Sequence, residues 1–196
     1  MRISSRPRAL HWALACVWIV AGWPGAAARH QGPDGTDRAT ALQAFTERTE
    51  RYVRLRARLE EPLPAFDARR DPWSLMLTRR YLASAIRTAR GYAHQGDIFT
   101  PPVAEIFRDL MAQTIDSVDI EELLDEEPEA AVSVVDVVVN EPVPAWALED
   151  VPEAVLRRLP TLPEAIAYRM VGRNLLLWDT HAEIVIDTLP HAFLGR

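Results

Sequence analysis

Three residues near the C-terminus have the types and spacing that could bind a metal ion. Asp179, His181 and Glu183 occupy alternate positions, and alternate residues of a β-strand project from the same face. Carboxylate oxygens and imidazole nitrogens are suitable ligands for a transition metal. The stretch from Thr180 to Ala182 also has the character of a turn, in which all three would be ordinary polar turn residues. A metal site here is therefore a hypothesis beside the simpler turn.

A second stretch that contains polar residues, HQGDIFTPP, separates two helical patterns. His94 and Asp97 in this stretch could form a ligand loop. The same stretch also has a structural explanation, because Gly96 suits a left-handed turn and Asp97 could accept backbone N–H groups of that turn. Ile98 and Phe99 could pack beneath it. We favour this structural interpretation and keep the ligand loop as the alternative.

The residue inventory limits the enzyme chemistry that is open to the chain. Cys16 is the only cysteine and lies in the predicted leader, so the mature chain has no thiol nucleophile and no disulfide. The chain contains no lysine, which excludes a phosphate-loop lysine and Schiff-base chemistry. No Gly-x-Ser-x-Gly motif is present. No cofactor motif is found, and an unrecognised hydrolase that uses paired carboxylates stays a secondary hypothesis.

The charge is unevenly distributed along the chain. Residues 29–108 hold 14 arginines against 10 acidic residues, whereas residues 109–196 hold 5 arginines against 18 acidic residues. A net-acidic domain is a poor candidate for nucleic-acid binding, because neutralising phosphate charge is the main source of that affinity.

The first 28 residues have the layout of a secretory signal: early arginines, an apolar run and a small-residue exit at Ala26–Ala28. The apolar run is too short for a membrane-spanning helix, and no second one follows. We therefore expect an exported protein, periplasmic or secreted, without a stable membrane span.

The remaining chain predicts a single α+β domain over residues 37–196, after a flexible start at 29–36. Three helices are expected in residues 37–118, the second with Asp71 as its N-cap and an end near Gly91 and Gly96. Residues 119–130 form an acidic connector. Residues 131–196 should supply a small antiparallel sheet. Its strands are expected at Val132–Val139, Ile166–Val171, Leu175–Asp179 and Glu183–Leu189, and a short helix at Pro152–Leu159.

The helices are expected to cover the apolar face of this sheet, because neither layer can bury its own apolar surface alone. Leu82, Ile106 and Phe107 should then share a core with the strands.

Two sets of side chains could bind a partner. The first helix carries arginines on its outer face that could meet an anionic partner or a polysaccharide. Mixed charge usually serves solubility, however, and the interleaved acids are Glu47, Glu50, Glu60 and Glu61. Trp73, Trp146 and Trp178 could stack on sugars, although such residues more often anchor a core or the edge of an interface.

Two segments, QGDIFTPPVAEIFRDLM and LPEAIAYRMVGRNLLLWDTHAEIVIDTLP, together with the DPW helix start, resemble a family of uncharacterised secreted bacterial proteins. The second segment alone is similar to the C-terminal hairpin of small periplasmic proteins of the nickel/cobalt-homeostasis group. The matching residues are Tyr168, Arg169, Val171, Gly172, Leu176, Asp179, Ile184, Ile186 and Asp187.

The sequence therefore favours an exported binding or interaction module over an enzyme. Its partner could be another protein of the bacterial envelope. A periplasmic metal-handling accessory protein is the alternative that the similarity of the tail implies.

Overall fold

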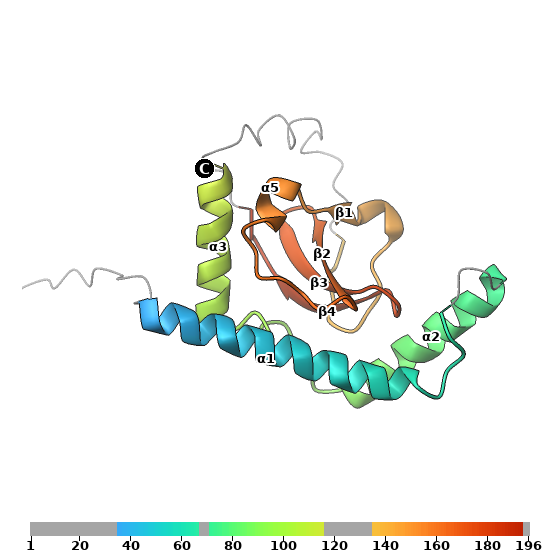
Figure 1. The fold of residues 1–196 in the computed structure, drawn as a ribbon. Helices are drawn as coiled ribbons and strands as arrows, with labels where there is room; N and C mark the ends of the chain where they lie inside the picture. The colour runs from blue at the N-terminus through green and yellow to red at the C-terminus, as the bar shows by residue number, and fades with distance from the viewer. Residues whose placement is uncertain (1–34, 67–70, 116–134, 194–196) are drawn as a thin grey trace, which may run out of the picture. The chain divides into compact units, whose positions relative to one another are not determined.

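The computed structural model describes residues 35–66, 71–115 and 135–193. It has the predicted α+β fold, with the helices first and an antiparallel sheet last (Figure 1). All described residues belong to the unit Pro33–Arg196. The predicted leader and the acidic connector at 119–130 lie outside the described residues.

Helix α1, Gly35–Glu60, buries one stripe of side chains spaced three and four residues apart. The buried residues are Ala41, Phe45, Thr49, Tyr52 and Arg56. The helix begins two residues before the predicted start at residue 37. It also buries an arginine that the sequence pattern did not distinguish from the exposed ones.

Helix α2, Pro72–Ala89, begins as predicted. Asp71 is its N-cap, with Oδ1 accepting a hydrogen bond of 2.9 Å from the backbone N–H of Ser74. The predicted extension toward Gly91 is wrong, because the helix ends at Ala89. Arg90 N still donates to the Ile86 carbonyl, but the Arg90 carbonyl accepts from the side chain of Asn140 at 3.1 Å instead of continuing the helix.

Helix α3, Pro101–Ile115, carries the most apolar of the helical surfaces. Val103, Ile106, Phe107 and Met111 are fully buried on it. Phe107 contacts the rings of Phe45 and Phe99, with centroids 5.1 and 5.2 Å away. None of the helices in the described ranges combines the length and the hydrophobicity needed to cross a membrane.

The sheet contains four antiparallel strands in the order β1-β2-β3-β4. They are β1 Glu149–Asp150, β2 Ile166–Val171, β3 Asn174–Asp179 and β4 Ile184–Leu189. The last three form the predicted meander. Gly172 occupies the β2–β3 turn with a φ of +53°, which glycine adopts without the steric cost of a side chain. The short helix α5, Glu153–Leu156, precedes β2 within its predicted range.

The predicted strand at Val132–Val139 is absent from the described part of that range. Residues 132–134 lie outside the described residues, and residues 135–139 are in no strand. Backbone hydrogen bonds to the sheet form just afterwards. Asn140 N donates to the Val185 carbonyl at 2.7 Å, and Val185 N donates to the Glu141 carbonyl at 3.0 Å. The segment therefore contributes side chains to the sheet's outer face rather than a strand to its edge.

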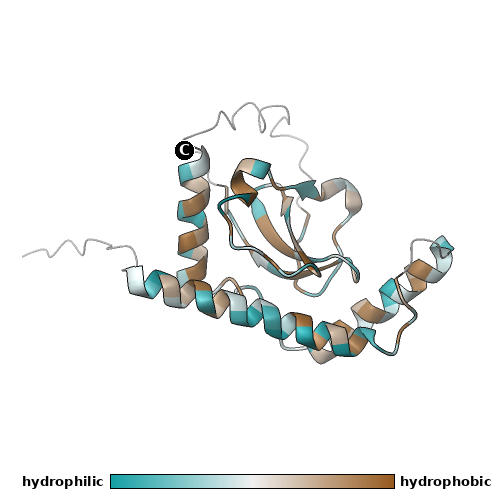
Figure 2. Ribbon diagram, in the orientation of Figure 1, coloured by the Kyte–Doolittle hydropathy of each residue, from teal (hydrophilic) through white to brown (hydrophobic). Residues whose placement is uncertain are grey.

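The sheet is covered on both faces. One core joins the helices to the strands and includes Leu82, Ile106, Phe107, Leu177 and Ile184, which confirms the predicted helical layer. A smaller core lies on the other face, where Leu176, Trp178 and Val185 pack with Val143 and Ala147. Figure 2 shows the contrast between the mostly hydrophobic strands and the hydrophilic residues that recur along α1.

Phe107→Ala should lower the free energy of unfolding by about 3–5 kcal/mol, because it opens a cavity at the junction of α1, α3 and the sheet. The matched control, Tyr92→Ala, removes a fully exposed ring and should leave stability unchanged. Chemical denaturation of both variants measures the difference. Equal effects would contradict the placement of Phe107 at the centre of the core.

Candidate functional site

The meander holds two fully buried carboxylates, Asp179 at the end of β3 and Asp187 in β4. A buried charge is costly unless hydrogen bonds or opposite charges compensate it. Each aspartate takes its partners from segments that are distant in the sequence. These two groups organise the polar side chains on the helical side of the fold.

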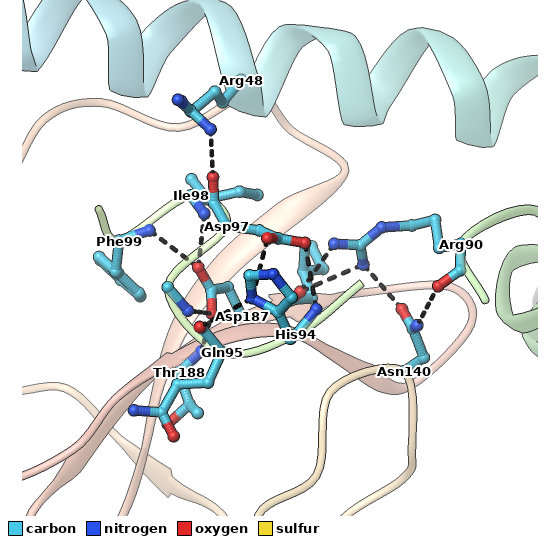
Figure 3. A network of polar contacts seen from close by, with 12 residues as sticks. Arg48, Arg90, His94, Gln95, Asp97, Ile98, Phe99, Asn140, Asp187 and Thr188 are labelled. Carbon is cyan, nitrogen blue, oxygen red and sulfur yellow. Dashed lines mark hydrogen bonds and ion pairs between the residues drawn. The ribbon is translucent and has the colours of Figure 1, made fainter. Parts of the chain in front are cut away.

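Asp187 holds the loop between α2 and α3 (Figure 3). Its Oδ1 accepts from Gly96 N at 2.8 Å and from Thr188 N at 2.8 Å. Its Oδ2 accepts from Ile98 N at 2.7 Å and from Phe99 N at 2.8 Å. Burial raises the pKa of Asp187 above its ordinary value, and the four N–H donors act in the opposite direction.

Arg90 completes this network from the end of α2. Its Nη1 donates to Asn140 Oδ1 at 2.7 Å, and both Nη atoms lie 3.1 Å from the Ile186 carbonyl. Its guanidinium lies over the ring of Tyr52, 5.1 Å from the centroid. Burial lowers the pKa of Arg90, while Tyr52 and the Asp187 carboxylate counteract the shift. Arg90 thus links the end of α2 to α1, to Asn140 and to β4.

The predicted ligand loop has the structural features that the sequence suggested. Gly96 has a φ of +89°, and Ile98 and Phe99 are buried. Asp97 Oδ2 accepts from His94 N at 3.1 Å, and its Oδ1 lies 3.1 Å from His94 Nδ1. The His94 side chain is 77% exposed. His94 and Asp97 therefore contact each other at the surface, and ligand binding by this pair stays a prediction.

Asp179 fastens the other end of the meander to α1. Its Oδ2 accepts from the Tyr52 hydroxyl at 2.7 Å and lies 3.0 Å from Arg56 Nε. Its Oδ1 accepts from His181 N at 2.9 Å and from Ala182 N at 2.7 Å, which closes the β3–β4 turn. Burial and the neighbouring carboxylate raise the pKa of Tyr52, so its hydroxyl stays protonated and can donate.

The three predicted metal ligands point to different partners. Residues 180–183 form a turn, so the alternating positions do not share one strand face. Asp179 is buried as described, whereas His181 Nδ1 lies 2.8 Å from Glu60 Oε1 and Glu183 Oε2 lies 3.1 Å from Arg79 Nη1. Within residues 35–66, 71–115 and 135–193, no group of three or more His, Cys, Asp or Glu residues could hold a metal ion. Metal binding stays a prediction.

Two hollows open on the described surface. One, of about 300 Å³, lies beside the outer face of the sheet and is lined by Trp178, Arg169 and Glu183 among others. The other, of about 290 Å³, lies where α1 meets the loop after α2. We call this second one the arginine hollow. Its polar lining consists of Arg48, Arg51, Tyr52, Arg90 and Asp97.

Sequence reasoning missed the residues that carry most of these contacts. Arg56 follows Tyr52 on the buried stripe of α1 at helical spacing, which was a usable signal. Asp187 interrupts the otherwise apolar strand IVIDTL, and an acid in a fully covered strand indicates a tertiary partner. Arg90 gave no local signal, because its partners come from residues 140 and 186.

Comparisons with protein-family models, with curated proteins and with solved structures find no match to this chain.

Asp187→Asn should lower the free energy of unfolding by about 2–4 kcal/mol, because either orientation of the amide turns an NH₂ group toward two backbone N–H donors. Asp136→Asn removes the same charge at an exposed position and should have no effect. Thermal or urea unfolding distinguishes the two variants. If Asp187→Asn unfolds with the wild type, the loop does not depend on this carboxylate.

Proposed function

We propose that the chain is exported and acts as a non-catalytic binding or interaction module in the bacterial envelope. The observation that carries this proposal is a set of large aromatic side chains left exposed on an otherwise well-buried fold. Trp73 and Tyr81 on α2 are 65% and 64% exposed, and Trp146 on the 3₁₀ helix η1, Ala145–Ala147, is 71% exposed. Exposed tryptophan and tyrosine are the residues that protein interfaces use most as anchors.

Helix α2 supports a role in recognition because it buries few residues for its length. Only Thr78, Leu82 and Ile86 are buried among the 18 residues of the helix. In the first half only Thr78 is buried, Leu75 and Leu77 are partly covered, and Arg79 contacts His181 and Glu183 of the β3–β4 turn. Trp178, the third candidate platform, is buried in the outer core and is not available to a partner.

The pairing of the carboxylates favours binding over catalysis. Each hollow has one carboxylate in its lining, and each has a partner: Asp97 contacts His94, and Glu183 contacts Arg79. The buried Asp179 and Asp187 accept several hydrogen bonds each. A general base needs an oxygen that can reach a substrate proton, and these oxygens are already used.

The leader-like first 28 residues and the resemblance of the chain to secreted bacterial proteins support export. The proposed partner is another envelope protein that places apolar surface over the exposed aromatic residues. The similarity of the tail to nickel/cobalt-homeostasis proteins would instead suggest metal handling, but no described contact favours it.

Photo-crosslinking in intact cells tests this proposal. Amine crosslinkers are of little use because the chain has no lysine. A photoreactive residue should therefore replace Tyr81 on α2. In the control it should replace Arg157, an exposed residue at the end of α5. We expect the full chain in the periplasmic or extracellular fraction and one dominant protein adduct at position 81.

An untagged copy of the chain should compete that adduct away, and the position-157 control should give none. A chain that stays in the cytoplasm would contradict export. Equal, non-competed adducts at both positions would contradict a specific partner surface on α2.

A further inference from the structure

The arginine hollow is lined by three arginines. Elsewhere in the described residues, some arginines have a carboxylate within ion-pair distance and others do not. Those paired in this way are Arg54, Arg56, Arg79, Arg87, Arg157 and Arg169. Arg48, Arg51 and Arg90 line one hollow together, and none of them has a carboxylate within ion-pair distance in the part of the chain that the structure describes.

The three guanidinium groups are oriented by neutral oxygens. Arg48 Nη1 donates to the Asp97 carbonyl at 2.5 Å, and Arg51 Nε donates to the Glu47 carbonyl at 3.3 Å. Arg90 donates to an amide oxygen and a carbonyl, as described above. Carbonyl and amide oxygens fix the direction of a guanidinium without neutralising its charge. The hollow is therefore positively charged and partly preorganised.

The acids near the hollow have other partners. Glu47 Oε1 accepts from the Gln43 side chain at 3.0 Å, and Glu50 Oε2 lies 3.4 Å from Arg54 Nη1. They are two of the four glutamates that make the arginine face of α1 a surface of mixed charge in the sequence. The Asp97 carboxylate contacts His94. The hollow is therefore lined by three guanidinium groups and the single carboxylate of Asp97, which leaves an excess of positive charge.

We propose that the arginine hollow binds the phosphate group of a phosphomonoester. Guanidinium groups match phosphate oxygens through paired N–H donors. Three cations around one hollow suit a group that carries close to two negative charges better than they suit a single carboxylate. A volume of about 290 Å³ is at the small end for ligand pockets. The hollow thus fits the phosphorylated end of a ligand, with the remainder outside.

Tyr52 explains why this position is rigid. Its ring lines the hollow, its hydroxyl donates to the buried Asp179, and Arg90 lies over its face. Arg90 cannot move away without losing its bonds to Asn140 and β4. A phosphate would therefore meet the fixed guanidinium of Arg90 together with those of Arg48 and Arg51 on α1.

Isothermal titration calorimetry of phenyl phosphate, at constant ionic strength, tests the site. Arg48→Gln/Arg51→Gln should weaken binding about ten-fold or more, since a charge-assisted hydrogen bond contributes about 1.5–3 kcal/mol. The matched control, Arg54→Gln/Arg58→Gln, removes the same charge from the same helix outside the hollow. Its affinity should change by less than about two-fold, as expected for screened surface charge.

The single variant Arg51→Gln tests the site without disturbing the fold. Arg51 bonds only within α1, whereas Arg48 also holds the loop after α2. This variant should weaken phenyl phosphate binding and leave the melting temperature of the free protein unchanged. Benzoate, which presents a carboxylate on the same ring, should bind at least about ten-fold more weakly than phenyl phosphate.

Absence of saturable phenyl phosphate binding by the wild type would overturn the proposal. So would equal weakening in the two double variants, or benzoate binding as tight as phenyl phosphate. These outcomes leave the partner surface on α2 untouched, because Tyr81 and Trp73 do not line the hollow.

Discussion

The burial of two carboxylates on one small meander is the constraint on which the rest of the structure depends. Asp179 and Asp187 are inaccessible to water, so each must be compensated by the protein itself. Asp179 takes a hydroxyl and a guanidinium from α1, and Asp187 takes three backbone N–H groups from the loop before α3. Apolar packing alone would allow the helices to slide over the sheet, whereas the directional hydrogen bonds from Tyr52, Gly96, Ile98 and Phe99 fix their position.

The surface features follow from this fixed position. Because Asp187 holds residues 96–99 and Asp179 holds Tyr52, the loop and α1 meet at one defined place. Arg90, at the end of α2, closes the junction by donating to the Ile186 carbonyl in β4. The arginine hollow lies at that junction. The far half of α2 takes no part in these bonds, and its aromatic side chains stay exposed. One region of the helical layer is thus rigid and charged, and another is apolar and available.

Periodicity predicted the elements that depend on local pattern. The helical stripes, the Asp71 cap and the three-strand meander follow from spacing and turn residues, and all are present. The predicted valine-rich strand is absent from its described part, because a β-branched run does not distinguish a strand from an extended segment that only packs on a sheet. Asn140 has a φ of +67°, and among residues 135–141 backbone bonds to β4 form only at Asn140 and Glu141.

The polar side chains could not be assigned from sequence, since their partners are distant. Sequence alone could not show that Asp179 accepts from Tyr52, because the two residues are 127 positions apart. Of the acids on α1, Glu47 accepts from Gln43 and Glu50 pairs with Arg54, so neither of them pairs with Arg48 or Arg51.

A double-mutant cycle of Tyr52→Phe and Asp179→Asn measures the central interaction directly. If the buried hydroxyl–carboxylate bond fixes α1 on the meander, the free energies of unfolding should be non-additive by about 1 kcal/mol or more. Effects that add to within about 0.3 kcal/mol would show that the two groups act independently, and would contradict this account.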